Sequence, residues 1–299
     1  MAEMRLMANL IASFRKETDD ENVSGIDLLS FRKFGVLEVI IKQLTEKDAA
    51  QVECEQKRGG LRKPSSMPVE DDISTIRNYL LEEIEKRMNQ YEMWDKHNFV
   101  KVRNLVLSRL IMFNAHRGGE PARLTVHKSK EAITGTWIDP NLIERINDSM
   151  EKYLIDNLKL AYQAGKGSRK LGPVIFPKDT LEPISKLLEE RSNCNVAEDN
   201  IFLFPNTSLS IDHASGYHCL KTVVYSCPNL QQPHILIADK FRHRVSNLFA
   251  QLDLPPENRE MFYRHMGHSE AINKNVYQCP LAVNEITRVG HFLLNAVDA

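Results

Sequence analysis

Segment 98–115 constrains the fold of this 299-residue chain more than any other stretch. It reads NFVKVRNLVLSRLIMFNA, and its large apolar residues recur at spacings of three and four: Phe99, Val102, Val106, Leu110 and Phe113. That periodicity is typical of an α-helix with one face in a hydrophobic core. The pair Gly118 and Gly119 is expected to stop this helix. Segment 98–115 is therefore predicted to be a helix of the core.

Other stretches repeat the helical pattern and one departs from it. Helices are predicted within 1–50, after Pro68, at 139–154, at 180–191 and from 239 onward. Residues 158–162 instead alternate like a strand, 165–169 (GKGSR) suit a turn, and 172–177 suit a returning strand. The sequence therefore predicts a mainly α fold with a small central β-hairpin or sheet (α+β), and the tip of the hairpin is basic.

A linker is predicted near the N-terminus. Residues 51–67 contain a Gly pair, two prolines and a basic cluster, a composition typical of a connecting segment. We therefore expect a helical N-terminal segment at 1–50, a linker at 51–67 and one domain at 68–299.

Charge and cysteine content exclude several classes of protein. The chain has 39 Lys and Arg against 40 Asp and Glu, a net charge of −1, so any nucleic acid must be bound by a local groove. The five cysteines form no CxxC pair, which favours free thiols in a reducing compartment. The His and Cys residues of 213–234 fit no zinc template, so no metal site is predicted. With no membrane-length apolar run and no signal-peptide pattern, we expect an intracellular protein.

Four short motifs follow one another along the predicted domain. They are HRGGE at 116–120, QAGKGSRK at 163–170, ADKFRH at 238–243, and MGHS ending at Ser269, with Tyr277 nine residues beyond His268. Each alone has an ordinary explanation, such as a local ion pair, a turn lysine or a charged helix face. In this order they resemble the arginine turn, lysine hairpin, second arginine box and histidine–tyrosine ending of the tyrosine recombinase (phage integrase) family, over roughly residues 68–290.

The resemblance implies a reaction and a set of roles. The family breaks and rejoins double-stranded DNA through a 3′-phosphotyrosine link, without metal or cofactor. Tyr277 would be the nucleophile, and Arg117 and Arg242 would neutralise the transition-state charge on the phosphate. Lys166 would be the general acid for the leaving 5′-oxygen, and His268 would bind a phosphate oxygen or help to move the tyrosine proton. Glu120 would brace Arg117.

Further basic residues are candidates for contacts to DNA phosphates: Arg123, Lys128, Lys130, Arg169, Lys170, Lys240 and Arg244. The apolar residues after Tyr277 have near-helical spacing, and in the family such a C-terminal helix docks on a neighbouring protomer. We therefore expect a homo-oligomer on DNA, with packing of this helix on its own core as the alternative. The compartment would be the nucleus in a eukaryote and the cytoplasm otherwise.

One position departs from the family pattern. Asp239 occupies a place where the family commonly has histidine, and an ionised carboxylate cannot donate a hydrogen bond to phosphate and would repel it. Asp239 either orients Arg242 or His268 without contacting the phosphate itself, or its presence in place of histidine has reduced the catalytic activity. His243 is not expected to substitute, because its direction on the helix differs from that of Arg242 by about 100°. Two alternatives stay open: an eroded fold that binds DNA or a protein without cutting, and relaxation of supercoils as by type IB topoisomerases.

Overall fold

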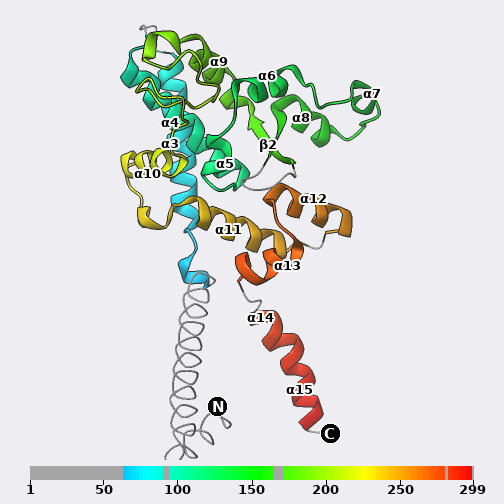
Figure 1. Cartoon of the computed structure of the whole chain (residues 1–299). Coiled ribbons are helices and arrows are strands. Elements are labelled where there is room, and N and C mark those ends of the chain that lie inside the picture. The colour runs from blue at the N-terminus through cyan, green and yellow to red at the C-terminus, as the bar shows by residue number, and fades with distance from the viewer. Residues whose placement is uncertain (1–62, 90–93, 165–170, 253, 280–281, 298–299) are drawn as a thin grey trace, which may run out of the picture. The chain divides into compact units, whose positions relative to one another are not determined.

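The computed structural model describes residues 63–89, 94–164, 171–252, 254–279 and 282–297 (Figure 1). Its contacts divide the chain into two compact units, Met1–Gly59 and Gly60–Ala299. The first unit, with the helices expected in 1–50, lies outside the described residues. So does most of the predicted linker.

The described part of the second unit is mainly helical with one small antiparallel sheet, which confirms that part of the prediction. Its α-helices are α3 (Glu70–Met88), α4 (Lys96–Asn114), α5 (Gly119–Ala122), α6 (Val126–Thr134), α7 (Pro140–Ile143), α8 (Ser149–Asn157), α9 (Leu181–Glu189), α10 (Gly216–Ser226), α11 (Ala238–Ala250), α12 (Pro256–Met266), α13 (Glu270–Ile272), α14 (Ala282–Asn284) and α15 (Gly290–Val297). Single turns are η1 (Pro64–Ser66), η2 (Lys178–Thr180), η3 (Ser192–Cys194) and η4 (Pro233–Ile235), with π-helical turns η5 (Asn273–Tyr277) and η6 (Glu285–Val289).

Helix α4 is the centre of the core. Its predicted apolar residues from Phe99 to Leu110 are fully buried, and so are Leu107 and Ile111 on its other sides. The helix is buried nearly all round because α3, α9, α10 and β2 all pack against it (Figure 1). Phe113, expected in the core, is 39% exposed. It lies in the last turn, where the guanidinium of Arg109 covers its ring at 5.2 Å from the centroid.

The glycine pair has a different role from the one predicted. Helix α4 already ends at Asn114, and Ala115 takes the left-handed conformation with φ of 49°. Gly118 instead precedes the short helix α5, and its backbone packs against Gly216 at the start of α10. A Cβ atom on Gly216 would come within 2.0 Å of the Gly118 carbonyl oxygen. This close approach fixes the turn that carries Arg117 against α10.

The predicted hairpin is present. Strand β1 (Leu158–Ala164) pairs antiparallel with β2 (Leu171–Pro177), and Ala164 lies opposite Leu171 where the strands enter the tip. The basic tip itself lies outside the described residues. Asn114 ties the hairpin to α4, because its side chain donates to the Ile175 carbonyl and accepts from the Ile175 amide, both at 2.8 Å.

One predicted helix differs from the structure, and two observed helices were not predicted. The expected helix at 139–154 is two helices, α7 and α8, because Asp148 caps a new helix by accepting from the Glu151 amide. Helices α6 and α10 were not predicted, since both are short and their buried faces include Ser129, Cys219 and other small residues.

A buried carboxylate on α3 supplies a stability prediction. Asp72 is 1% exposed and accepts hydrogen bonds from the backbone amides of Gln231 and Gln232, both at 2.8 Å. Asp72→Ala leaves both amides without an acceptor, so we expect the free energy of unfolding to fall by about 2 to 3 kcal/mol. Urea denaturation measures this. The neighbouring Asp71 is exposed, and Asp71→Ala is the matched control. Equal effects of the two changes would contradict the prediction.

Candidate active site

Tyr277 is the residue on which the predicted site residues converge. It ends the π-helical turn η5, and it is 5% exposed. Arg117, from the turn after α4, donates from Nη2 to the Tyr277 hydroxyl at 3.1 Å. The two residues are 160 positions apart in the sequence. A donor with a permanent positive charge at this oxygen stabilises negative charge there.

Two more predicted residues lie against the Tyr277 ring. The imidazole of His268 stacks on it, with ring centroids 4.9 Å apart and an interplanar angle of 15°. The guanidinium carbon of Arg242 is 4.9 Å from the ring centroid. The structure therefore brings Arg117, Arg242, His268 and Tyr277 together from four separate segments.

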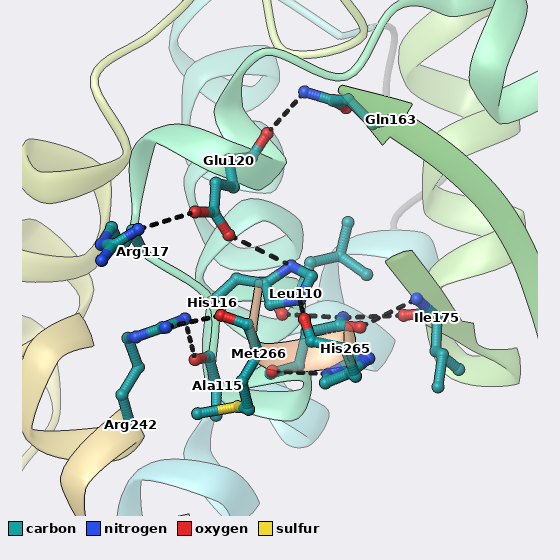
Figure 2. A network of polar contacts seen from close by, with 11 residues as sticks. Leu110, Ala115, His116, Arg117, Glu120, Gln163, Ile175, Arg242, His265 and Met266 are labelled. Carbon is teal, nitrogen blue, oxygen red and sulfur yellow. Dashed lines mark hydrogen bonds and ion pairs between the residues drawn. The ribbon is translucent and has the colours of Figure 1, made fainter. Parts of the chain in front are cut away.

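Arg242 is the largest fully buried side chain of the described residues. It donates from Nη1 to the Ala115 carbonyl at 3.2 Å and from Nη2 to the Met266 carbonyl at 2.7 Å (Figure 2). These two carbonyls end α4 and α12, so Arg242 joins both helix ends to α11. Its Nε atom is also buried and has no partner among the described residues.

Glu120 lies between Arg117 and His116 (Figure 2). Its carboxylate oxygens are 3.6 Å from Arg117 Nη1 and 3.8 Å from His116 Nδ1. Its backbone carbonyl accepts a hydrogen bond from Gln163 Nε2 of β1 at 3.0 Å. Glu120 is thus placed where a brace for Arg117 was expected, and it also links the arginine turn to the hairpin.

A pair of histidines joins α12 to the arginine turn. His116 donates from Nε2 to the His265 carbonyl at 3.0 Å, and His265 donates from Nε2 to the Asn114 carbonyl at 2.9 Å (Figure 2). Burial lowers the pKa of His116 to about 3, with a further contribution from His265, and burial also lowers the pKa of His265. Burial, followed by the charge of Arg242, lowers the pKa of His268 to about 4. All three rings are therefore neutral at pH 7.

A cleft of about 850 Å³ opens beside these residues. Its walls include Arg117, Glu120 and His268, the hairpin residues Ala164 and Leu171, and one face of α12. That face contributes Arg259 and Arg264, which the sequence analysis did not single out. Both are exposed. Their position on the helix directly before MGHS was the only signal in the sequence that could have pointed to them.

The structure corrects the account of Asp239 and His243. His243 is 2% exposed, donates from Nδ1 to the Tyr277 carbonyl at 2.8 Å, and has its ring 5.1 Å from the Tyr277 ring. Asp239 Oδ2 is 3.4 Å from His243 Nε2. The partner of Asp239 is therefore His243 and not, as expected, Arg242 or His268. The angular offset of His243 from Arg242 turns it toward η5, and so makes it part of the site.

Three residues predicted to contact DNA have surroundings that the sequence did not indicate. Lys240 is 7% exposed, so it is not a surface lysine. Arg244 donates to both carboxylate oxygens of Glu70 at 2.9 and 2.6 Å, and Lys128 donates to Glu131 at 2.9 Å. The sequence did not reveal these two acidic partners, because Glu70 is distant along the chain and helix α6 was not predicted.

The remaining basic residues divide in two groups. Lys130 is exposed on α6, and Arg123 is half-buried at the end of α5. Lys166, Arg169 and Lys170 lie outside the described residues.

Within the described ranges, no group of three His, Cys, Asp or Glu residues could hold a metal ion. In the same ranges, no helix is both long and apolar enough to cross a membrane.

Comparison with known proteins adds no relative. No protein-family model matches this sequence, and no curated protein matches it.

Proposed function

We propose that this protein breaks and rejoins DNA strands through Tyr277, as a metal-independent tyrosine recombinase. The observation that carries the proposal is the convergence of Arg117, Arg242 and His268 on one tyrosine. The same residues carry the sequence resemblance, and they come from segments that only the fold brings together.

In the proposed reaction, the Tyr277 oxygen attacks a DNA phosphorus atom and its proton passes to water. A phosphotyrosine bond forms, the bond to the 5′-oxygen breaks, and that oxygen leaves as a hydroxyl after taking up a proton. Attack by a 5′-hydroxyl later reverses these steps and releases the tyrosine. Arg117 stabilises the charge that develops on the tyrosine and phosphate oxygens, because its guanidinium stays protonated.

The hairpin supports the assignment of Lys166 as the proton donor. Ala164 and Leu171, where the described strands end, both line the cleft. Lys166 is two residues from Ala164 in the sequence. We therefore assign Lys166 as the general acid for the leaving 5′-oxygen, the role that the sequence resemblance implies.

His268 is assigned to the phosphate rather than to the tyrosine proton. Its ring is stacked nearly parallel to the Tyr277 ring, so its nitrogens do not point along the O–H bond. Its Nε2 atom is buried without a partner among the described residues, and the side chain lines the cleft. His268 Nδ1 donates to the Ser269 carbonyl at 3.3 Å, so Nε2 donates to a phosphate oxygen only once the ring has taken up a second proton beside the phosphate.

Double-stranded DNA is the proposed partner, bound by the cleft with Arg259 and Arg264 on its wall. The proposal includes a second protomer at the C-terminal helix. Ile286, Val289 and Leu293 are exposed there, which does not support their packing on the core of the same chain.

A covalent-capture experiment tests the proposed nucleophile. The full chain is incubated with a diverse pool of nicked suicide duplexes, denatured, and examined for DNA attached to protein. We expect a covalent band for wild type and for Tyr153→Phe, an exposed tyrosine on α8, and no band for Tyr277→Phe. Arg117→Ala is expected to lower the capture rate about a hundredfold, since it removes one transition-state donor.

The other outcomes identify the alternatives. DNA binding without a covalent band would contradict cleavage and favour the eroded, non-cutting fold. A Tyr277-dependent band together with relaxation of any supercoiled plasmid, without sequence preference, would favour a type IB topoisomerase. Sequencing of DNA trapped by wild type would show whether a preferred site exists.

A further inference from the structure

The contact between α11 and η5 gives Asp239 a role of its own. Residues 239 and 243 are one helical turn apart on α11, so their side chains lie next to each other. Of the two, His243 contacts the last residue of η5. Asp239 reaches His243, and His243 reaches Tyr277.

The Tyr277 carbonyl needs such a partner. A helix leaves its last carbonyls without intrahelical donors. The chain turns extended at Gln278, whose amide makes the final helical bond of η5, to the Asn273 carbonyl at 3.0 Å. His243 Nδ1 supplies the donor for the Tyr277 carbonyl at 2.8 Å. The same imidazole touches the tyrosine ring, so one side chain contacts both the backbone and the side chain of Tyr277.

The next turn of α11 extends the contact. Ser246 Oγ bonds to Asn273 Oδ1 at 2.9 Å, and Asn247 accepts from the Cys279 amide. These residues hold the two ends of the segment from 273 to 279. His243 acts between them, at Tyr277 itself.

We propose that Asp239 and His243 form a brace that positions Tyr277 for attack, an inference that rests on the proposed function. Asp239 accepts from Nε2 and the Tyr277 carbonyl accepts from Nδ1, so the ring acts in this brace with both nitrogens protonated. Both are positioning residues, because neither touches the reacting oxygen. The carboxylate of Asp239 then helps to position Tyr277, and the absence of a histidine at this position is not a sign of lost activity.

The position of the carboxylate agrees with this role. Asp239 lines a second hollow of about 490 Å³, which shares Arg117 with the larger cleft. Its carboxylate is 3.4 Å from His243 Nε2, so the imidazole lies between the carboxylate and the Tyr277 carbonyl. The hydrogen bond from His243, with the charges of His243, Arg242 and Lys240, lowers the pKa of Asp239 against the opposing effect of burial, so the carboxylate stays ionised. A histidine at 239 would lose the attraction between carboxylate and imidazole.

Four variants test the brace in the full-length protein: Asp239→Asn, Asp239→His, His243→Asn and His243→Phe. The rate of covalent capture is measured in single turnover at saturating nicked duplex, and the Kd for the same duplex is measured separately. We expect His243→Phe to lower the capture rate about a hundredfold and Asp239→Asn about tenfold, with Kd changed less than about twofold, because a small misplacement of a reacting group slows the chemical step. His243→Asn should retain part of the rate, since its amide nitrogen can replace Nδ1 as donor.

Hydrogen exchange of the amides in η5 gives a second readout that needs no activity. We expect faster exchange at η5 in Asp239→Asn and His243→Phe, with exchange in α3 and α4 unchanged. The control is Glu83→Gln, which removes an ion pair of the same helical spacing on α3, where Glu83 is 3.6 Å from Arg87. This change should leave both capture rate and η5 exchange as in wild type.

The results separate this inference from the proposed function. A wild type that never captures DNA refutes the nucleophile, and η5 exchange then decides whether the brace exists. Capture that rises in Asp239→His, or that is unchanged in Asp239→Asn and His243→Phe, overturns the brace while Tyr277 remains the nucleophile. A loss of protection throughout the fold would show that the two residues serve stability alone, which also overturns it.

Discussion

Arg242→Ala is expected to lower the free energy of unfolding by about 3 to 5 kcal/mol, because it leaves two buried carbonyls unpaired and opens a cavity among three helices. The carbonyls are those of Ala115 and Met266. The change also removes a guanidinium from the Tyr277 ring, so we expect no covalent capture from the folded fraction. Urea denaturation and the capture experiment measure the two effects.

Two further variants separate packing from hydrogen bonding at this position. Arg242→Met fills most of the volume but donates no hydrogen bond, so it should recover only part of the lost stability. Arg145→Ala, at an exposed arginine, is the control and should change the free energy of unfolding by less than about 0.5 kcal/mol. An Arg242→Ala protein as stable as this control would contradict the structural role of the buried guanidinium.

Acid is expected to destabilise the fold well above the range in which carboxylates titrate. The folded pKa values of His116 and His268, about 3 and about 4, lie below the usual 6.5. Below pH 6.5 the unfolded chain therefore binds protons that the folded chain does not bind. The contribution of these histidines to the free energy of unfolding is fully present above pH 6.5 and declines as the pH falls below it. His116 alone should lower the free energy of unfolding by about 2 kcal/mol between pH 6.5 and about 5. His265, whose pKa is also lowered, acts in the same direction.

Urea titrations at pH 7, 6 and 5 test this dependence. His116→Gln keeps a donor for the His265 carbonyl but does not titrate, so its stability should depend less on pH than that of wild type. His234→Gln, at an exposed histidine, should preserve the wild-type dependence. A free energy of unfolding that is constant from pH 7 to pH 5 would rule out the buried neutral histidines.

Local pattern was sufficient for much of the fold. The apolar spacing of α4, the acidic start of α3 and the alternation of β1 are properties of neighbouring residues, and the structure confirms all three elements. The misplaced boundaries have local causes as well. A left-handed alanine rather than a glycine ended α4, and a cap at Asp148 divided the helix expected at 139–154.

Only some residues of the candidate site could be predicted from local sequence patterns. The order of the motifs selected Arg117, Arg242, His268 and Tyr277, which the structure brings together. It did not select His243, because an angular argument on one helix cannot say which element packs on the other side. It also counted Arg244 and Lys240 as surface cations, although one is paired with Glu70 and the other is buried.

The mainly helical class, the hairpin and the residue types of the candidate site follow from the amino-acid sequence alone, since each depends on short-range periodicity or on motif order. Which of those side chains meet depends on how the helices pack. Hydrogen bonds such as that from Arg117 to Tyr277 join residues 160 positions apart and exist only after the core has packed. The same packing buried Arg242, made three histidines neutral, and turned Asp239 toward His243, because burial and contact are properties of the assembled fold.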